Sequence, residues 1–349
     1  MLNVLVVDDS ALMRKRMCDI IDLVPQFTVA DTARDGKSAL ELLSHNSYDC
    51  MVMNVYLCDG SGIDVLKKLK DQGRHIPVIA ISSAVREDRE MTIYALEAGA
   101  VEVVVRPYRF SDSAETEKFR RSLVNALRAV ADGSRNTRNH LSGTGTGMDE
   151  DRRKVSNRYS LVAIACSTGG PQALNRMIPM LPAHLGVPVV IVQHMPEGFT
   201  ASLADRIDSE SRVAVREAMN DEVLLPDCVY IAPGGRHFTI REDRTGRMQA
   251  HVYDAPPVHN LRPCADVMYE SLCSISHDNI LCVVLTGMGA DGTEGISKLK
   301  KCKHIYTITQ DEGSCVVYGM PRSVKEKGLS DETVPITEIA RAISKELGV

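Results

Sequence analysis

A serine, a histidine and an aspartate each follow an apolar stretch in the C-terminal half of the chain. Ser167 ends LVAIACS, His194 ends PVVIVQH, and Asp291 lies in the glycine-rich turn after ILCVVLTG. A hydroxyl is a weak nucleophile until a neutral imidazole accepts its proton and a carboxylate orients that imidazole. Because the carboxyl ends of parallel strands meet at one edge of a sheet, the three residues predict a Ser-His-Asp acyl-transfer site.

The residues after Ser167 are typical of a tight turn into a helix. The sequence continues TGGPQAL, and Pro171 suits the first turn of a helix, whose N–H groups and dipole favour negative charge beside the hydroxyl. Each catalytic candidate alone has an ordinary interpretation, as a turn, capping or core residue, but their joint placement favours catalysis. The common α/β-hydrolase elbow is disfavoured, because Ala165 replaces its first glycine and the order Ser, His, Asp differs.

A nucleotide-binding regulator is the competing interpretation of the same turn. Gly287, Gly289 and Gly292 match a G-x-G-x-x-G dinucleotide fingerprint, and Asp311 follows the next strand. This pattern predicts bound NAD or FAD, but it leaves the serine and the histidine without a role. Isolated matches of this kind are frequent, so we rank it below the triad.

Five short apolar segments alternate with helical patterns in the N-terminal part of the chain. The expected strands are NVLVVD, FTVADTA, CMVMN, PVIAISS and EVVVRP. In the first helical segment one face carries Met13, Met17, Ile20, Ile21 and Val24. The alternation predicts a doubly wound, five-stranded parallel sheet of the flavodoxin-like type. The carboxyl ends of its strands carry Asp8, Asp9, Asn54, Ser82 and Arg106.

Residues 132–158 are polar and rich in Gly, Ser and Thr, which is typical of a linker. We therefore expect one domain over residues 1–131 and a second over residues 159–349. The second contains six apolar segments typical of strands, which are LVAIACS, PVVIVQH, RVAVREA, CVYIAPGG, ILCVVLTG and HIYTITQ. Helical stretches separate them, and FTIR and QAHVYD flank a DRTGR turn. This predicts a doubly wound α/β domain with a β-hairpin element.

The composition excludes several functional classes. The chain has 349 residues, 44% hydrophobic and 25% charged, with no apolar run long enough for membrane insertion. The N-terminal MLNVLVVDDS lacks the basic region of a signal peptide, which favours the cytoplasm. A net charge of −5 argues against nucleic acid as a partner. Ten cysteines without a C-x-x-C pair predict free thiols rather than a zinc site or redox motif.

Several long motifs resemble one known family. The segments ACSTGG, QHMPEGFT, YIAPGGRH, LRPCADV, TGMGADG and SCVVYGMPR are similar to the signatures of the chemotaxis protein-glutamate methylesterase (CheB) family. The N-terminal VVDDS, SS and RP resemble its receiver domain. The resemblance implies hydrolysis of glutamate γ-methyl esters, and deamidation of glutamines, on methyl-accepting chemotaxis receptors. It also implies a chemotaxis histidine kinase as a second partner.

The resemblance also implies a role for each candidate residue. Ser167 would be the nucleophile, His194 the general base and then acid, and Asp291 its orienting partner. The backbone N–H of Met288 would help to bind the oxyanion, and Arg262 is either a substrate contact or part of a structural ion pair. No cofactor is expected, and no metal in this domain, because the imidazolium can protonate the leaving methoxide.

The N-terminal domain departs from the receiver pattern. Asn54 stands at the position of the phosphate-accepting aspartate, and its amide lacks the attacking carboxylate oxygen. Arg106 replaces the family's lysine with a wider guanidinium. Asp8 and Asp9 remain, so we expect at most weak binding of Mg²⁺. The hypothesis is a receiver that is not switched by aspartyl phosphorylation.

Two further functions are compatible with parts of the chain. A catalytically weak module that docks on receptors without turnover is the main alternative, and the complete triad argues against it. A DNA-binding response regulator is disfavoured, because no basic recognition helix follows the receiver-like domain.

Overall fold

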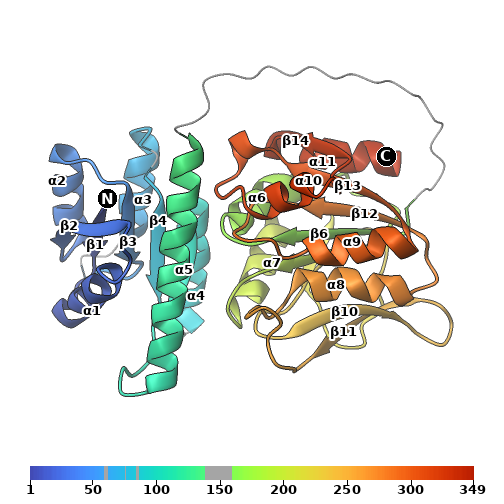
Figure 1. Ribbon diagram of the computed structural model, residues 1–349, viewed down its shortest axis with the longest axis horizontal. Coiled ribbons are helices and arrows are strands. Elements are labelled where there is room, and N and C mark those ends of the chain that lie inside the picture. The colour runs from blue at the N-terminus through green and yellow to red at the C-terminus, as the bar shows by residue number, and fades with distance from the viewer. Residues whose placement is uncertain (59–61, 75, 84–85, 138–158) are drawn as a thin grey trace. The chain divides into compact units, whose positions relative to one another are not determined.

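The computed structural model describes residues 1–58, 62–74, 76–83, 86–137 and 159–349. The chain divides into two compact units, Met1–Asn136 and Thr137–Val349 (Figure 1). No helix among the described residues is both long and apolar enough to cross a membrane.

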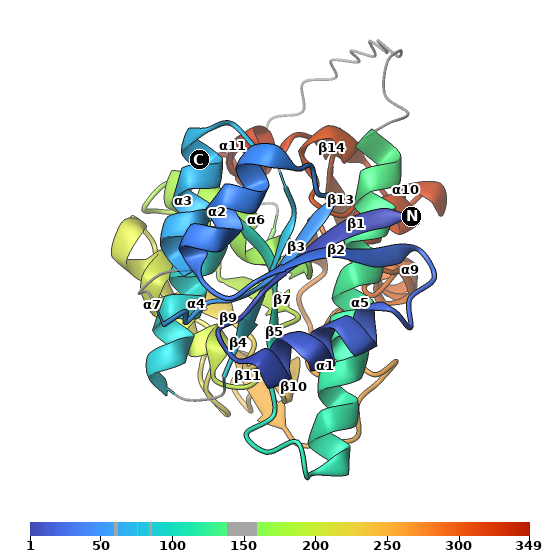
Figure 2. The same ribbon diagram turned by 90° about the vertical axis from the view of Figure 1, so that its left-hand side faces the viewer.

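The N-terminal unit is a five-stranded parallel sheet with the order β2-β1-β3-β4-β5, as predicted. Its strands are β1 (Leu2–Val7), β2 (Phe27–Ala33), β3 (Cys50–Asn54), β4 (Val78–Ser82) and β5 (Ala100–Val105). Its helices are α1 (Ala11–Ile21), α2 (Gly36–His45), α3 (Gly62–Asp71), α4 (Arg86–Ala98) and α5 (Ser113–Thr137). Figure 2 shows α1 and α5 on one face of this sheet and α2, α3 and α4 on the other.

The predicted apolar face of the first helix is confirmed. Ser10 caps α1 by accepting a hydrogen bond from the Met13 N–H, and the helix buries its apolar side chains against the sheet. All five predicted side chains are buried, namely Met13, Met17, Ile20, Ile21 and, just beyond the helix, Val24. The packed helix therefore fixes the short segment between β1 and α1, which contains Asp8 and Asp9.

The start expected for the linker is wrong. Helix α5 runs to Thr137, so residues 132–137 continue a helix rather than beginning an irregular segment. This stretch contains no proline, and adding residues to an existing helix is easier than starting one, so a polar composition does not end it. The rest of the predicted linker, residues 138–158, lies outside the described residues.

The C-terminal unit contains a seven-stranded parallel sheet with the order β14-β13-β12-β6-β7-β9-β8. Its strands are β6 (Leu161–Cys166), β7 (Val189–Gln193), β8 (Ala214–Glu217), β9 (Cys228–Ile231), β12 (Asn279–Val284), β13 (His304–Gln310) and β14 (Glu332–Val334). The predicted hairpin is confirmed, since β10 (His237–Glu242) pairs antiparallel with β11 (Met248–Tyr253). Strand β14 was not predicted.

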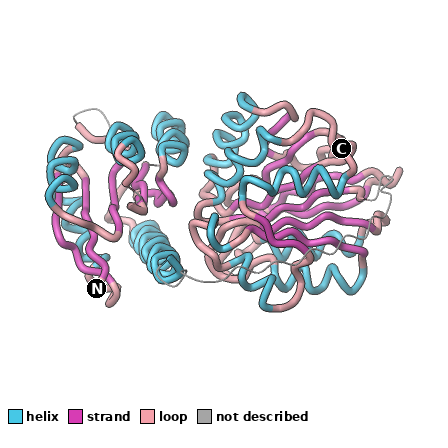
Figure 3. Tube along the Cα trace, turned by 90° about the horizontal axis from the view of Figure 1, so that it is seen from above, coloured by secondary structure: helices cyan, strands magenta, loops and turns pink. Residues whose placement is uncertain are grey.

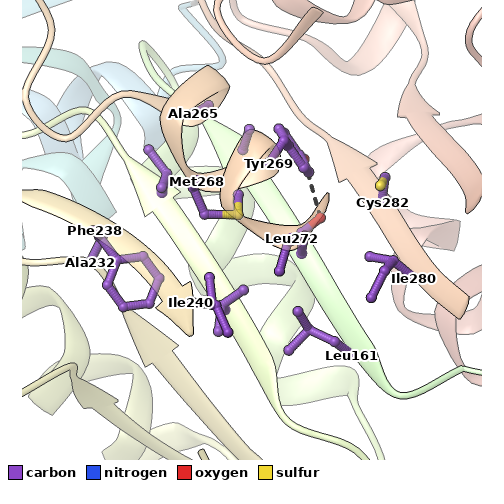
Figure 4. Packing of buried hydrophobic residues seen from close by; sticks show 14 of the residues in the cluster. Leu161, Ala232, Phe238, Ile240, Ala265, Met268, Tyr269, Leu272, Ile280 and Cys282 are labelled. Atoms are coloured by element: carbon purple, nitrogen blue, oxygen red, sulfur yellow. Dashed lines mark hydrogen bonds between the residues drawn. The ribbon is translucent and has the colours of Figure 1, made fainter. Parts of the chain in front are cut away.

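Helices cover both faces of the seven-stranded sheet (Figure 3). They are α6 (Gly170–Met177), α7 (Phe199–Glu210), α8 (Ala265–Ser271), α9 (Thr293–Cys302), α10 (Met320–Glu326) and α11 (Ile336–Leu347), with short 3₁₀ turns at Ile178–Met180, Leu272–Ser274 and Glu312–Ser314. Helices α8, α9 and α10 share one buried core with the hairpin and with alternate residues of β6, β7 and β12. Figure 4 shows part of this core, with Met268, Tyr269 and Leu272 of the α8 region beside Leu161 and Ile280.

The expectation of free thiols is wrong for one pair of cysteines. Cys273 and Cys302 form a disulfide, with their Cα atoms 5.9 Å apart. Cys273 lies just after α8 and Cys302 is the last residue of α9, and these two helices pack against each other. The pairing therefore depends on a contact between helices, which the sequence spacing of the cysteines does not reveal. The other eight cysteines are free, as expected.

Candidate functional site

Three neighbouring strands of the C-terminal sheet end beside one another. Strand β6 lies between β12 and β7, and Cys166 pairs with Gln193 at the ends of β6 and β7. Ser167 and His194 are the next residues, and Asp291 follows β12 after a short turn. The topology therefore places all three predicted residues at the carboxyl edge of the central strands.

Ser167 sits in a turn that the main chain holds on both sides. Its N–H donates to the Thr286 carbonyl at 3.0 Å, and its own carbonyl accepts from the Gly170 N–H at 2.7 Å. Gly169 has a φ of +79°, which favours glycine, and α6 begins at Gly170 with Pro171 in its first turn, as predicted. The side chain of Ser167 is half-buried at the start of that helix.

The ring of His194 and the carboxylate of Asp291 form a close pair. Nε2 of His194 lies 2.8 Å from Oδ2 of Asp291, and their side chains are 10% and 4% exposed. An imidazole bound through Nε2 to an ionised carboxylate carries its proton on that nitrogen. The lone pair for a general base is then on Nδ1.

The first turn of α8 binds the carboxylate of Asp291. Oδ2 accepts from the Ala265 N–H at 2.6 Å, and Oδ1 accepts from the Asp266 N–H at 2.9 Å. Burial opposes ionisation, but the hydrogen bond and charge of His194 and these two amides lower the pKa of Asp291 below its usual range. The carboxylate therefore stays ionised and can stabilise an imidazolium.

The described residues show no hydrogen bond between the Ser167 hydroxyl and the His194 ring. Hydrogen bonds between a nucleophile and its base often form fully only once substrate is bound. The structure therefore joins His194 with Asp291 directly and brings Ser167 to the same edge through the strand ends.

The turn that contains Met288 packs directly against Ser167. A Cβ placed on Gly287 would lie 2.9 Å from Cβ of Ser167 and would overlap Sδ of Met320. The N–H of Met288 makes no hydrogen bond within the described part of the chain, whereas the N–H of Ser167 is already used by Thr286. The Met288 amide is thus a free donor one residue from this contact.

The turn does not resemble a dinucleotide site. Gly287 is covered by Met320, and the N–H of Gly292, at the start of α9, already donates to the carboxylates of Asp266 and Asp291 rather than facing a phosphate site. Asp311 accepts from the N–H and hydroxyl of Ser314 and caps a short 3₁₀ turn. The features of the fingerprint therefore serve local structure.

Arg262 has partners within its own loop. Its Nη1 donates to the Ala255 carbonyl at 2.9 Å and lies 3.5 Å from Oδ1 of Asp254. The side chain is 33% exposed. The structural ion pair, one of the two roles expected for Arg262, is therefore present, and contact of Arg262 with substrate stays a prediction.

Three functional neighbours were missed by sequence reasoning: Gln193, Cys264 and Asp266. Oδ1 of Asp266 accepts from the N–H groups of Gly292 and Gly295 at 3.0 and 2.7 Å, which fixes the turn after Asp291. The strand-end position of Gln193, and the position of Cys264 and Asp266 at the start of a helix, were the available signals.

Cys264, Asp266 and Asp291 bring three potential metal-ligand atoms within 4.8 Å of one another. However, the Cys264 thiol donates to Oδ1 of Asp291 at 3.1 Å, and burial together with the Asp291 charge raises the pKa of this thiol to about 12. A protonated thiol is a poor metal ligand. The contacts favour a hydrogen-bond network that supports Asp291.

The N-terminal unit also gathers its predicted residues at strand ends. The side-chain Nδ2 of Asn54 donates to Oδ1 of Asp9 at 3.4 Å, and the side-chain Oδ1 of Asn54 accepts from the Tyr56 N–H at 3.1 Å. Asp8 is fully buried, and its Oδ2 makes no hydrogen bond with any described residue. Burial raises the pKa of Asp8 to about 6; the charge of Asp9 adds to this rise, while Arg106 opposes it.

Ser82 and Arg106 lie at the ends of the adjacent strands. The Arg106 N–H donates to the Ser82 carbonyl at 2.8 Å, and the Ser82 hydroxyl accepts from the Thr92 hydroxyl at 2.6 Å. The hydroxyl of Ser82 is thus held by α4. Weak Mg²⁺ binding at Asp8 and Asp9 stays a prediction.

Each of the two units matches a known protein family. The family model described as CheB methylesterase matches residues 162–343, and the model described as response regulator receiver domain matches residues 4–116. The crystal structure of the Thermotoga maritima CheB methylesterase catalytic domain is 40% identical, with a TM-score of 0.52, covering 55% of this chain and 99% of that chain.

Relatives of known name align with this chain over nearly the whole length of both proteins. The protein-glutamate methylesterase/protein-glutamine glutaminase of Symbiobacterium thermophilum is 39% identical over 366 residues, covering 99% of this chain and 97% of the relative. A Bacillus subtilis protein of the same name is 38% identical over 355 residues, covering 99% and 98%. The chain therefore belongs to the CheB methylesterase family and carries a response regulator receiver domain before its methylesterase domain.

Proposed function

We propose that the chain hydrolyses glutamate γ-methyl esters, and deamidates glutamines, on methyl-accepting chemotaxis receptors in the cytoplasm. The observation that carries the proposal is the buried His194–Asp291 pair beside Ser167, where three central strands end. The names of the full-length relatives support the substrate class. A chemotaxis histidine kinase is proposed as a second partner through the receiver domain.

In this mechanism the Ser167 hydroxyl attacks the ester carbonyl while Nδ1 of His194 takes its proton. The resulting imidazolium is stabilised through Nε2 by Asp291. The same proton then passes to the leaving methoxide, which departs as methanol and leaves an acyl-serine ester. Water, deprotonated by the neutral imidazole, hydrolyses this ester to the glutamate and free serine. A glutamine substrate follows the same path with ammonia as the leaving group.

The Met288 N–H is the proposed donor to the tetrahedral oxyanion. Removing one such donor commonly costs about 3 to 4 kcal/mol of transition-state stabilisation. The turn that carries this donor packs against Ser167 at Gly287, where a Cβ would lie 2.9 Å from Cβ of Ser167.

The Gly287→Ala variant should therefore lose activity, because its methyl group must displace both Ser167 and Met320. We expect kcat/KM to fall by about 100-fold, measured by methanol release. Gly313→Ala is the matched control, since a Cβ there meets only Oδ2 of Asp311 at 3.6 Å. Equal activity of the two variants would argue against close packing of this turn on the nucleophile.

The experiment that tests the proposed function is methanol release from a methylated receptor signalling fragment incubated with the full chain. We expect stoichiometric methanol and conversion of methyl glutamate to glutamate, seen as a mass loss on the receptor peptide. A protein that binds the fragment but releases no methanol would instead be a docking module.

We also propose that the receiver is not switched by aspartyl phosphorylation, because Asn54 has no carboxylate to attack a phosphodonor. Its amide instead donates to Asp9. After treatment with acetyl phosphate and Mg²⁺, the chain with Asn54 should show no phosphoryl adduct in the mass spectrum of peptides containing position 54. Asn54→Asp should gain an adduct that is lost at alkaline pH. An alkali-labile adduct on the unsubstituted chain would contradict the proposal.

A further inference from the structure

Gln193, the last residue of β7, has its side-chain amide buried between the ends of β6 and β7. It is 1% exposed. Its Nε2 donates to the main-chain carbonyl of Ser167 at 3.1 Å and to that of His194 at 3.0 Å. One amide group thus joins the main chains of the two residues that the proposed function uses as nucleophile and base.

The amide extends the pairing of β6 and β7 beyond its last backbone contact. The His194 N–H donates to the Cys166 carbonyl at 3.2 Å, and the registered pairing of the strands ends at Cys166 and Gln193. Beyond this point the Ser167 N–H turns to Thr286, on the opposite side of β6. The side chain of Gln193 therefore supplies a link between the strands where their chains diverge.

The orientation of the Gln193 amide follows from its other neighbours. Its Oε1 accepts from the Cys166 thiol at 3.0 Å, and burial raises the pKa of that thiol, so the thiol remains a donor. The reversed amide would direct Oε1 at two carbonyl oxygens. A Cβ on Gly170 would overlap Oε1, so helix α6 begins in contact with the amide.

We propose that Gln193 is a positioning residue that sets the separation of Ser167 from His194. This inference rests on the proposed function, in which the serine must pass its proton to the imidazole. The amide holds both residues by their main chains and leaves their side chains free to react. Small errors in such a separation are costly, because proton transfer and attack both require close alignment.

The test uses Gln193→Met, which keeps the length of the side chain and removes both donors. Tyr269→Phe is the matched control. The Tyr269 hydroxyl also belongs to a fully buried side chain, in the core drawn in Figure 4, and lies 3.2 Å from the Ala163 carbonyl and 3.0 Å from the Val283 carbonyl, on neighbouring strands. Each variant therefore removes a buried donor group that contacts two main-chain carbonyls.

We expect both variants to unfold at a lower temperature than the natural chain, but only Gln193→Met to lose turnover. Its kcat for methanol release should fall about 10- to 100-fold, with KM nearly unchanged. Its Ser167 should react with a fluorophosphonate probe more slowly by a similar factor. Tyr269→Phe should keep the natural kcat and the natural probe rate. A natural kcat in folded Gln193→Met would overturn the inference.

Gln193→Glu provides a second variant with the original shape, in case the methionine variant does not fold. The two facing carbonyls favour its neutral acid, which keeps one donor, so its kcat should lie between those of Gln193→Met and the natural chain. A natural kcat in this variant would also overturn the inference. Failure of the proposed function is distinguishable, because it would appear as methanol release that persists in Ser167→Ala.

Discussion

Replacing Ser167 with alanine is expected to lower methanol release by about a million-fold, the loss seen when a serine nucleophile of a triad is removed. The hydroxyl supplies the only attacking atom in the proposed covalent step, so the acyl-serine ester cannot form without it. The measurement is methanol released from a methylated receptor fragment under single-turnover conditions.

Ser160→Ala is the matched control for that experiment. Ser160 immediately precedes β6, whose other end is followed by Ser167, and its hydroxyl donates to the Asn279 carbonyl at 3.0 Å. This control should keep full activity, and Ser167→Ala should still bind the receptor fragment. Comparable methanol release by both variants would remove the catalytic assignment of Ser167.

The strand ends could be predicted because the central strands are buried on both faces. Strand β6 consists of apolar residues, and β12 is apolar after its first residue, Asn279, so their carboxyl ends are clear in the sequence. Strand β14 was missed because Glu332–Val334 is short, half-exposed and at the edge of the sheet. The limit of α5 was misjudged for a related reason, since a polar stretch carries no apolar period to mark a helix.

The identity of the site residues was more predictable than their contacts. Ser167 and His194 each follow a recognisable strand, and that fact alone places them near one edge of the sheet. Which nitrogen of His194 binds Asp291 depends on where the turn after β12 and the first turn of α8 place the Asp291 carboxylate. The role of Gln193 depends on the register of β6 and β7, which no local pattern contains.

In the receiver domain the chemical consequence of one residue could be predicted, but the contacts of the pocket could not. The resemblance to receiver domains predicts that position 54 is the phosphate-accepting position, and the chemistry of an amide then predicts that Asn54 cannot accept phosphate. The structure adds that Asn54 and Asp9 are hydrogen-bonded and that Oδ2 of the buried Asp8 makes no hydrogen bond with any described residue. These contacts require the ends of two strands, β1 and β3, to lie beside each other.

Asp291→Asn should lower kcat by about 10,000-fold while leaving the fold intact. Oδ1 of Asp291 accepts from the N–H groups of Asp266 and Gly292 and from the Cys264 thiol, so an asparagine oxygen is expected to take this position. The amide nitrogen then replaces Oδ2 and donates to Nε2 of His194. The imidazole is forced to carry its proton on Nδ1, and the lone pair that is proposed to accept the Ser167 proton is lost.

The Asp291→Asn variant should also lose some stability, because its amide nitrogen faces the Ala265 N–H, which now has no acceptor there. Activity should therefore be measured well below the unfolding temperature of the variant. The tautomer can be read directly from ¹⁵N chemical shifts of the His194 ring: the natural chain should be protonated at Nε2 and the variant at Nδ1. A variant that keeps Nε2 protonated yet loses activity would show that Asp291 acts mainly through its charge, and full activity would exclude it from the mechanism.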